Sequence, residues 1–182
     1  MADVNKSWRF VLSNEDSNPP SGRVTTEPGG AMARLGVNSA AWPEAVSDGF
    51  YSMSLADALQ YAEDLFKYHY WSALCGYSLV SNLIAAKWSD LAYNGGVKES
   101  TLLVQRAANT LASPALATDG ICGDLTVARV NMLCGEQEEA LYDAIIAQGV
   151  TFYEELRAER PEEYSAALEA AWLDRLRIRP PV

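Results

Sequence analysis

From residue 4 to residue 22 the chain reads VNKSWRFVLSNEDSNPPSG, and this stretch marks the first change from helix to loop. Apolar side chains recur there at the spacing of one helical face, at Val4, Trp8, Val11 and Leu12. We therefore predict a helix that ends near Glu15. The prolines and the glycine of residues 18–22 cannot continue it, because proline lacks a backbone N–H and glycine weakens a helix.

Turn signals dominate residues 17–53. They are Asn-Pro-Pro-Ser-Gly at 18–22, Glu-Pro-Gly-Gly at 27–30, Trp-Pro at 42–43 and Ser-Asp-Gly at 47–49. The short run Arg-Val-Thr-Thr at 23–26 favours a β-strand. We expect a small lobe of loops with a β-hairpin near the N-terminus.

Helical periodicity returns after Ser54. The expected helices cover residues 54–70, 79–93 and 102–111, then a short segment from about Leu125, a long one that holds Leu141 to Leu156, and a last one that starts at Pro161. Helices with one small β lobe make a mostly α, or α+β, domain.

Composition and charge limit the possible partners. The chain has 182 residues, of which 49% are hydrophobic and 21% charged, enough for one buried core without disulfides or metals. Asp and Glu total 24 against 14 Lys and Arg, which gives a formal net charge of −10. This sign disfavours contact with a phosphate backbone, so we expect no nucleic-acid partner.

The cysteines and the histidine argue against a metal site. Cys75, Cys122 and Cys134 are an odd number, typical of reduced thiols, and His69 is the one histidine. No recognised zinc-ligand spacing connects them, so we expect no metal and no cofactor. A thiol-protease pairing of His69 with Cys75 lacks a third group to orient the histidine.

The sequence also lacks an apolar run of the roughly 18 residues that a membrane span needs. The N-terminal stretch at 1–6, Met-Ala-Asp-Val-Asn-Lys, lacks the apolar core of a signal peptide. We therefore expect a protein without an integral membrane segment that is made in a cytosol and that depends on another factor if it acts outside it.

Glu15 is the strongest candidate for chemistry, because of its place at the predicted end of a helix. The partial negative charge of a helix C-terminus and the neighbouring Asp16 both disfavour ionisation. Both influences raise the pKa of Glu15 above its ordinary value, as a general acid requires. The alternative is an ordinary solvated glutamate that ends a helix.

A series of motifs runs in one order along the chain. The first are Phe-Val-Leu-Ser-Asn-Glu at 10–15, Glu-Pro-Gly-Gly-Ala at 27–31 and Gly-Val at 36–37. Tyr-Trp at 70–71, Asp-Leu-Ala-Tyr-Asn-Gly-Gly at 90–96 and Gln-Arg-Ala at 105–107 follow. The last are Asp-Gly-Ile-Cys-Gly-Asp-Leu-Thr at 119–126, Phe-Tyr at 152–153 and Ala-Trp-Leu-Asp-Arg at 171–175. Together they resemble the glycoside hydrolase family 108 N-acetylmuramidases, which include phage endolysins and secretion-activating muramidases.

The resemblance covers nearly the whole chain. It implies a lysozyme-like helical fold in which residues 1–96 form the catalytic region. Residues 97–182 then form a helical half similar to the family's peptidoglycan-binding region, packed with the first into one unit. The resemblance further implies that Glu15 protonates the glycosidic oxygen between N-acetylmuramic acid and N-acetylglucosamine.

The chain departs from the family pattern around this acid. The departures are Asp16-Ser17, Glu27 and Met32, where the family has two glycines, an aspartate and a threonine, and an interval between Glu15 and Glu27 that is about three residues longer than the family's. Glu27 is the candidate second carboxyl, because Pro28 favours an extended backbone before it and Gly29-Gly30 allow a sharp turn after it. Alternatively, Thr25 and Thr26 hold the attacking water and Glu27 is only a turn residue.

Four further residues are candidates for substrate binding. Asp90 and Asn94 lie four apart on one helix face, so both are expected to line a sugar cleft, although Asn94 could serve only as a helix cap. Tyr70 and Trp71 are expected to stack on sugar rings, with burial in the core as the alternative. The arginines of residues 175–179 either contact an anionic surface or complement a helix dipole.

These observations predict an endolysin of phage or prophage origin, a lysozyme-type N-acetylmuramidase that cleaves the MurNAc-β-1,4-GlcNAc bond of peptidoglycan with Glu15 as general acid. Its partner is the glycan strand. We expect a monomer that is made in the host bacterial cytoplasm and acts on the cell wall after a release that depends on a holin. Two alternatives stay open: a lytic transglycosylase acting on the same bond, and a catalytically inactive muramidase-like module that binds glycan or a protein partner.

Overall fold

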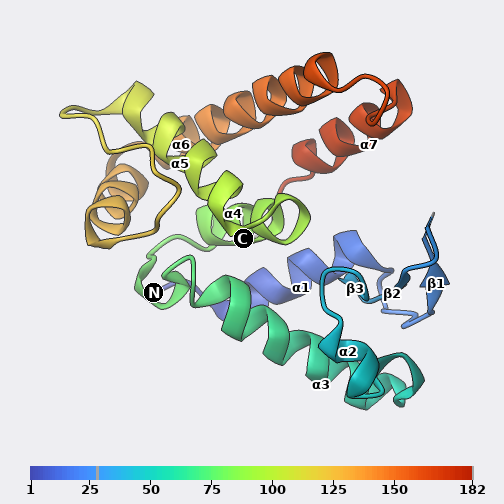
Figure 1. Ribbon diagram of the computed structural model, residues 1–182. Helices are drawn as coiled ribbons and strands as arrows, with labels where there is room; N and C mark the ends of the chain where they lie inside the picture. The colour runs from blue at the N-terminus through green and yellow to red at the C-terminus, as the bar shows by residue number, and fades with distance from the viewer. Residues whose placement is uncertain (28, 182) are drawn as a thin grey trace.

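The computed structural model describes residues 1–27 and 29–181 (Figure 1). Helix α1 spans Val4–Glu15, and the Asp3 side chain caps it by accepting a hydrogen bond from the Asn5 N–H at 2.8 Å. The helix ends because Asp16 leaves the helical region, with φ −134° and ψ −120°. The predicted end of the first helix is thereby confirmed. Pro28, expected to extend the backbone before it, lies outside the described residues.

A three-stranded antiparallel sheet follows α1 and stands at one end of the molecule, beside the C-terminal end of that helix (Figure 1). Its strands are β1 (Thr25–Thr26), β2 (Met32–Arg34) and β3 (Val37–Asn38), in the order β1-β2-β3. The sequence predicted one β-prone run, because strands of two or three residues are too short to show alternation. A short helix α2 (Glu44–Ser47) and a 3₁₀ turn (Phe50–Ser52) occupy the rest of the predicted loop region.

Buried Arg34 fixes this β lobe to the segment that follows it. Its Nε donates to the Gly22 carbonyl at 2.8 Å, and its Nη1 donates to the carbonyls of Phe50 at 2.8 Å and Met53 at 3.0 Å. A buried guanidinium is tolerated when backbone oxygens satisfy its N–H groups. The strands are therefore held by a polar side chain inside the lobe as well as by their own ladder.

Helix α3 (Leu55–Leu65) passes without interruption into a π-helical segment, Phe66–Trp71, and a 3₁₀ turn follows at Gly76–Ser78. The π geometry shows in the bond from the Ser72 N–H to the Lys67 carbonyl, five residues back, at 3.1 Å. Each such turn shifts the helical face by one residue. Trp71 therefore enters the core, fully buried, while Tyr70 is only half-buried.

Helix α4 (Asn82–Gly95) runs through the middle of the fold, and all ten residues from Leu83 to Ala92 are buried. Ser81 caps its start, and Gly96 ends it with φ +92°, a conformation that favours glycine. Helix α5 (Val97–Leu111) begins at the next residue, earlier than the sequence pattern indicated. One hydrophobic cluster surrounds α4 and takes side chains from both ends of the chain, including Trp8, Val11, Trp88, Val104, Leu141, Ile145 and Leu176.

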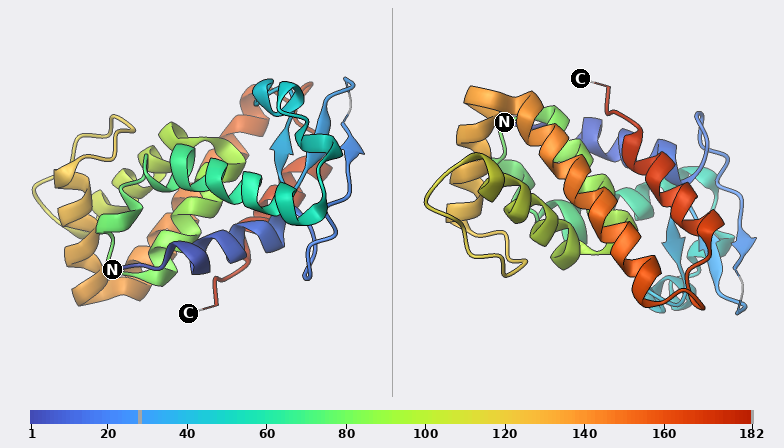
Figure 2. Two further views of the ribbon diagram at one scale, coloured as in Figure 1. Left: turned by 90° about the horizontal axis from the view of Figure 1, so that it is seen from below. Right: turned by 90° about the horizontal axis from the view of Figure 1, so that it is seen from above.

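The last elements are α6 (Asp124–Glu159) and α7 (Ala166–Arg177). Non-helical backbone at Gln137 (φ −155°, ψ 52°) divides α6 into the short and the long helix that the sequence predicted. Helix α7 starts at Ala166, five residues after Pro161, because Ser165 rather than the proline caps it. Figure 2 shows α7 beside α6 and extending towards the end of α1 and the sheet.

The architecture is the predicted one, a mostly α, lysozyme-like domain with a small β lobe near its N-terminus. Among the described residues, the helices do not combine the length and apolar character that crossing a membrane requires.

Candidate active site

A cleft of about 410 Å³ lies between the end of α1 and the inner face of the β lobe. Its lining consists of Glu15, Asp16, Ser21, Arg23, Thr25, Glu27, Ala33, Arg34, Leu35, Gly36 and Asn38. Glu15, Glu27 and Thr25, three residues singled out in the sequence, therefore share one cavity. The Glu15 side chain is 16% exposed, whereas Glu27 and Thr25 are exposed on the lobe.

The turn between β2 and β3 brings backbone directly against Glu15. Leu35 and Gly36 both have positive φ, +51° and +77°, as in the two-residue hairpins that match the twist of their strands. A Cβ on Gly36 would lie 2.7 Å from Glu15 Cγ and 2.6 Å from a ring carbon of Tyr93. Glycine is thus required at this turn both by its conformation and by the approach of the carboxyl.

An ion pair from the other end of the chain reaches Glu15. The Arg175 guanidinium on α7 donates through Nη2 to Glu15 Oε1, and the same nitrogen donates to Asp90 Oδ1 at 2.9 Å. Arg175 Nε also donates to Asp90 Oδ1 at 3.2 Å, and Asn14 Nδ2 donates to that oxygen at 2.9 Å. Two carboxylates therefore share one arginine behind the cleft.

Burial raises the pKa of Glu15, and the nearby negative charge of Asp90 adds to the effect, while the charge and hydrogen bond of Arg175 oppose it. The direction agrees with the sequence prediction, but the main cause is loss of solvent rather than the helix dipole. Asp16 contributes differently from what was expected. Its carboxylate turns to the loop and accepts hydrogen bonds from Ser21 Oγ at 2.6 Å and the Gly22 N–H at 2.7 Å.

Those hydrogen bonds favour the ionised form of Asp16. Burial alone favours the neutral acid, but the hydrogen bonds from Ser21 and Gly22 outweigh it and lower the pKa of Asp16. The structure thus holds two neighbouring carboxyls in unlike environments. Glu15 is favoured as a proton donor and Asp16 as an ionised organiser of the loop.

The other predicted residues lie outside the lining of this cleft. Thr26 is exposed and pairs with Met32 across β1 and β2. Trp71 is completely buried, so in this structure no face of its ring is open to a sugar. Tyr70 is half-buried with its ring centroid 4.7 Å from that of Tyr93, and burial raises its pKa, as does the negative charge of Glu15. Tyr70 therefore packs against Tyr93 near Glu15 and does not line the cleft.

Asp90 and Asn94 share a helix face, as predicted, and both border a small gap beside Trp172 and Arg175, outside the Glu15 cleft. Asp90 is 2% exposed and serves Arg175 from behind Glu15 instead of lining the cleft. Asn94 Nδ2 donates to the Tyr153 hydroxyl at 3.0 Å and lines a separate cavity of about 480 Å³ with Trp172. The interval of one helical turn is enough to place one residue in the interior and the other outside.

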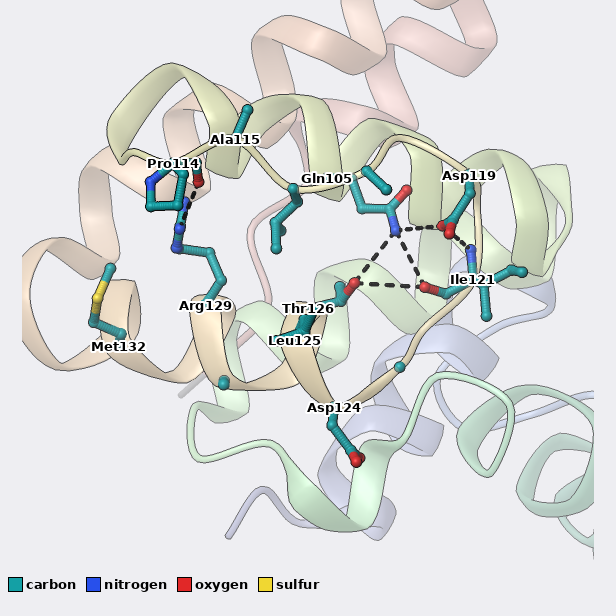
Figure 3. A pocket seen from close by; sticks show the side chains of 14 residues that line it. Gln105, Pro114, Ala115, Asp119, Ile121, Asp124, Leu125, Thr126, Arg129 and Met132 are labelled. Atoms are coloured by element: carbon teal, nitrogen blue, oxygen red, sulfur yellow. Dashed lines mark hydrogen bonds between the residues drawn. The ribbon is translucent and has the colours of Figure 1, made fainter.

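A further cavity, of about 570 Å³, lies between the end of α5, residues 112–123 and the start of α6 (Figure 3). Gln105 is its polar centre, since Nε2 donates to Asp119 Oδ1 at 2.9 Å and to the Ile121 carbonyl at 3.1 Å. Its Oε1 accepts from the Gly120 N–H at 3.0 Å. The stretch 119–126 is therefore a loop folded around Gln105. The cavity shares no described lining residue with the Glu15 cleft.

Arg175 is the site residue that sequence reasoning did not place. It was interpreted as part of a basic tail or as the closing residue of a motif, and 160 residues separate it from Glu15. In residues 1–27 and 29–181, no group of three or more His, Cys, Asp and Glu side chains is arranged to hold a metal ion.

Comparison with known proteins adds information about the fold. No protein-family model matches the sequence, and no curated protein sequence matches it. Among solved structures, SagA of Brucella abortus matches with a TM-score of 0.59 over 96% of this chain and 96% of that chain, at 16% sequence identity. The chain therefore shares its overall fold with SagA. At this identity the match concerns the fold alone.

Proposed function

We propose that this protein is a lysozyme-type N-acetylmuramidase that cleaves the glycan strands of peptidoglycan with Glu15 as general acid. The observation that carries the proposal is a largely buried carboxyl with a raised pKa at the wall of a cleft that also holds a second, exposed carboxyl. Such a pair in unlike environments is the arrangement that glycosidases use. The motif resemblance to the family 108 muramidases and the fold shared with SagA both support it.

In the proposed reaction, the oxygen that links N-acetylmuramic acid to N-acetylglucosamine takes the proton of Glu15 as its bond to the anomeric carbon breaks. Positive charge then develops on the sugar, and water attacks the anomeric carbon. Glu27 accepts the proton of that water, and Thr25 beside it holds the water in place. Peptidoglycan strands are the substrate class, and the cleft needs no cofactor for this chemistry.

Digestion of purified peptidoglycan followed by mass spectrometry of the fragments tests the proposal. Hydrolysis leaves reducing N-acetylmuramic acid ends, whereas a transglycosylase leaves 1,6-anhydro ends. We expect Glu15→Gln to lower the rate at least about a hundredfold, the usual contribution of a general acid, without loss of the folded state. Glu44→Gln on α2 makes the same charge change at an exposed position outside the cleft and should retain the rate.

If the products carry 1,6-anhydro ends, the protein is a lytic transglycosylase and not a hydrolase. If it binds the strands but releases no product, it is a module that binds glycan without cleaving it.

A further inference from the structure

Arg175 contacts Glu15 from behind the cleft. It belongs to α7, whereas the cleft is lined by the end of α1, the following loop and the sheet. Its side chain is 18% exposed and is absent from the described lining of the cavity. Arg175 therefore reaches the acid without facing the space in which a sugar would lie, and any effect it has on a reaction passes through Glu15.

Asp90 fixes the arginine in place independently of Glu15. Its Oδ1 accepts from both Nε and Nη2 of Arg175, at 3.2 and 2.9 Å, and also from Asn14 at 2.9 Å. The second oxygen lies 3.8 Å from the Lys87 ammonium. With two contacts to Asp90, the guanidinium stays paired whether or not Glu15 carries a charge.

We propose that Arg175, anchored by Asp90, is a positioning residue that orients the Glu15 side chain in the cleft and stabilises the carboxylate left after Glu15 gives up its proton. This inference deepens the function proposed above and rests on it for its catalytic meaning. It also makes α7 part of the candidate active site.

The chemistry of a general acid supplies the reason. Glu15 must hold a proton before the reaction and carry a negative charge after it, in a place where burial disfavours that charge. A fixed positive group beside it lowers the cost of the charged state. Arginine suits this place because its planar fork presents several N–H groups at fixed angles, so one side chain serves two carboxylates.

Several other charged and titratable groups surround Glu15. Asp90 and Tyr93 approach from α4, Tyr70 from the π-helical segment, Asp16 from the loop, and Arg23, Glu27 and Arg34 from the β lobe. Arg175 differs from these groups, because it lowers the pKa of Glu15 by both its positive charge and a hydrogen bond. Removal of this single side chain should therefore change the titration of Glu15.

The first test measures Glu15 directly by NMR titration of its carboxyl carbon, with assignment by Glu15→Gln. In Arg175→Met we expect Glu15 to titrate at higher pH than in the wild type, because the opposing positive charge is gone. Arg177→Met is the matched control, since Arg177 lies on the same helix with its side chain 63% exposed and pairs with Asp174 at 3.5 Å. An unchanged Glu15 titration in Arg175→Met overturns the inference.

The second test follows the rate of peptidoglycan cleavage against pH. A reaction that needs protonated Glu15 slows on the alkaline side, and Arg175→Met should move this limb to higher pH while the maximal rate falls about tenfold or more. A purely structural role would lower the thermal midpoint without moving the limb. Arg177→Met should match the wild type in both respects.

Arg175→Lys keeps the inference testable if the methionine variant does not fold. Lysine retains the charge but cannot serve both carboxylates with the geometry of a guanidinium. We expect the Glu15 titration to stay near that of the wild type and the cleavage rate to fall; a wild-type rate in this variant would contradict the orienting role. If the wild type cleaves no peptidoglycan but the Glu15 titration moves in Arg175→Met, the proposed function fails while the electrostatic coupling stands.

Discussion

Two of the cavities in this protein are built in opposite ways. The cleft at Glu15 joins the end of α1 to the β lobe and is backed by side chains from α4 and α7. The cavity around Gln105 is lined by residues 105–132, one continuous stretch of chain. The first depends on buried charges brought together from distant positions, and the second on a neutral amide that bonds to its own neighbourhood.

The two cavities differ in the free energy needed to bury their polar groups. A neutral amide that forms hydrogen bonds with a loop backbone loses little on burial, whereas charges taken out of water destabilise the fold unless they are paired. Proteins keep such buried charges mainly where chemistry requires a perturbed group. The contrast therefore agrees with the proposal that the Glu15 cleft is the active site, and damage to it should cost more stability than damage to the Gln105 loop.

The largest effect is expected for Asp90→Ala. It removes the acceptor of Arg175 and leaves that arginine and buried Lys87 without their shared carboxylate. Breaking a buried pair in this way costs about 3–5 kcal/mol. Thermal denaturation should show a midpoint lower by about 10 °C for a chain of this size. Asp174→Ala, also near α7's end but with its side chain 81% exposed, should leave the midpoint nearly unchanged. Equal losses in the two variants would contradict the contrast.

Gly36→Ala should have the next largest effect. Its φ of +77° disfavours alanine, and the added Cβ would meet Glu15 and Tyr93 at less than 3 Å. We expect a loss of about 2–3 kcal/mol in the free energy of unfolding, measured by urea titration, together with reduced wall cleavage. Gly123→Ala, next to the other cavity, has nothing within 4 Å of the new Cβ and a φ of −105°, so it should be tolerated. A tolerated Gly36→Ala would show that the turn does not press on the acid.

Gln105→Ala tests the locally built cavity. It leaves the Gly120 N–H without its acceptor and frees the loop at 119–123. An unpaired buried N–H costs about 1–3 kcal/mol, and we expect a loss of about this size in the free energy of unfolding. Cleavage of peptidoglycan per folded molecule should not change. A strong loss of cleavage would mean that the two cavities act together.

The smallest effect concerns the pH dependence of stability. Because the pKa of Glu15 is raised in the folded state, that state binds the proton more tightly than the unfolded chain does. The stabilising contribution of protonated Glu15 is complete below the unfolded pKa of about 4.3 and is lost as the pH rises through the folded pKa. The thermal midpoint of the wild type relative to Glu15→Gln should therefore fall as the pH is raised from 3 to 8. A difference that rises with pH would reverse the assigned direction.

Part of this site could be predicted because its signals are local. The spacing of Trp8, Val11 and Leu12 fixes the face and the end of α1, and that end places Glu15. Turn residues then predict that a small lobe must follow. The motif resemblance selected Glu27, and Thr25 and Thr26 were the alternative holders of the water. Glu27 and Thr25 line the same cleft as Glu15, whereas Thr26 does not.

Other parts had no local signal. The sequence left open whether Tyr70 and Trp71 stack on sugars or lie in the core. The π-helical segment shifts the register by one residue, so Trp71 is buried and Tyr70 is half-buried. Helix α7 begins at Ala166 because the hydroxyl of Ser165 before it accepts a hydrogen bond from the Leu168 N–H, and the predicted start at Pro161 is wrong. The partnership of Arg175 with Asp90 depends on how α7 packs against α6 and so brings Arg175 to α4, and no spacing in the sequence encodes that packing.

The distance along the chain between Glu15 and Arg175 also has a kinetic consequence. A contact between residues 160 apart in the chain closes almost the longest loop that this chain permits. Closing that loop loses conformational entropy, which opposes formation of the contact. Contacts of such high sequence separation form after the local helices in the usual order of folding. We therefore expect the contact between Glu15 and Arg175 to form later in folding than the local contacts within the helices.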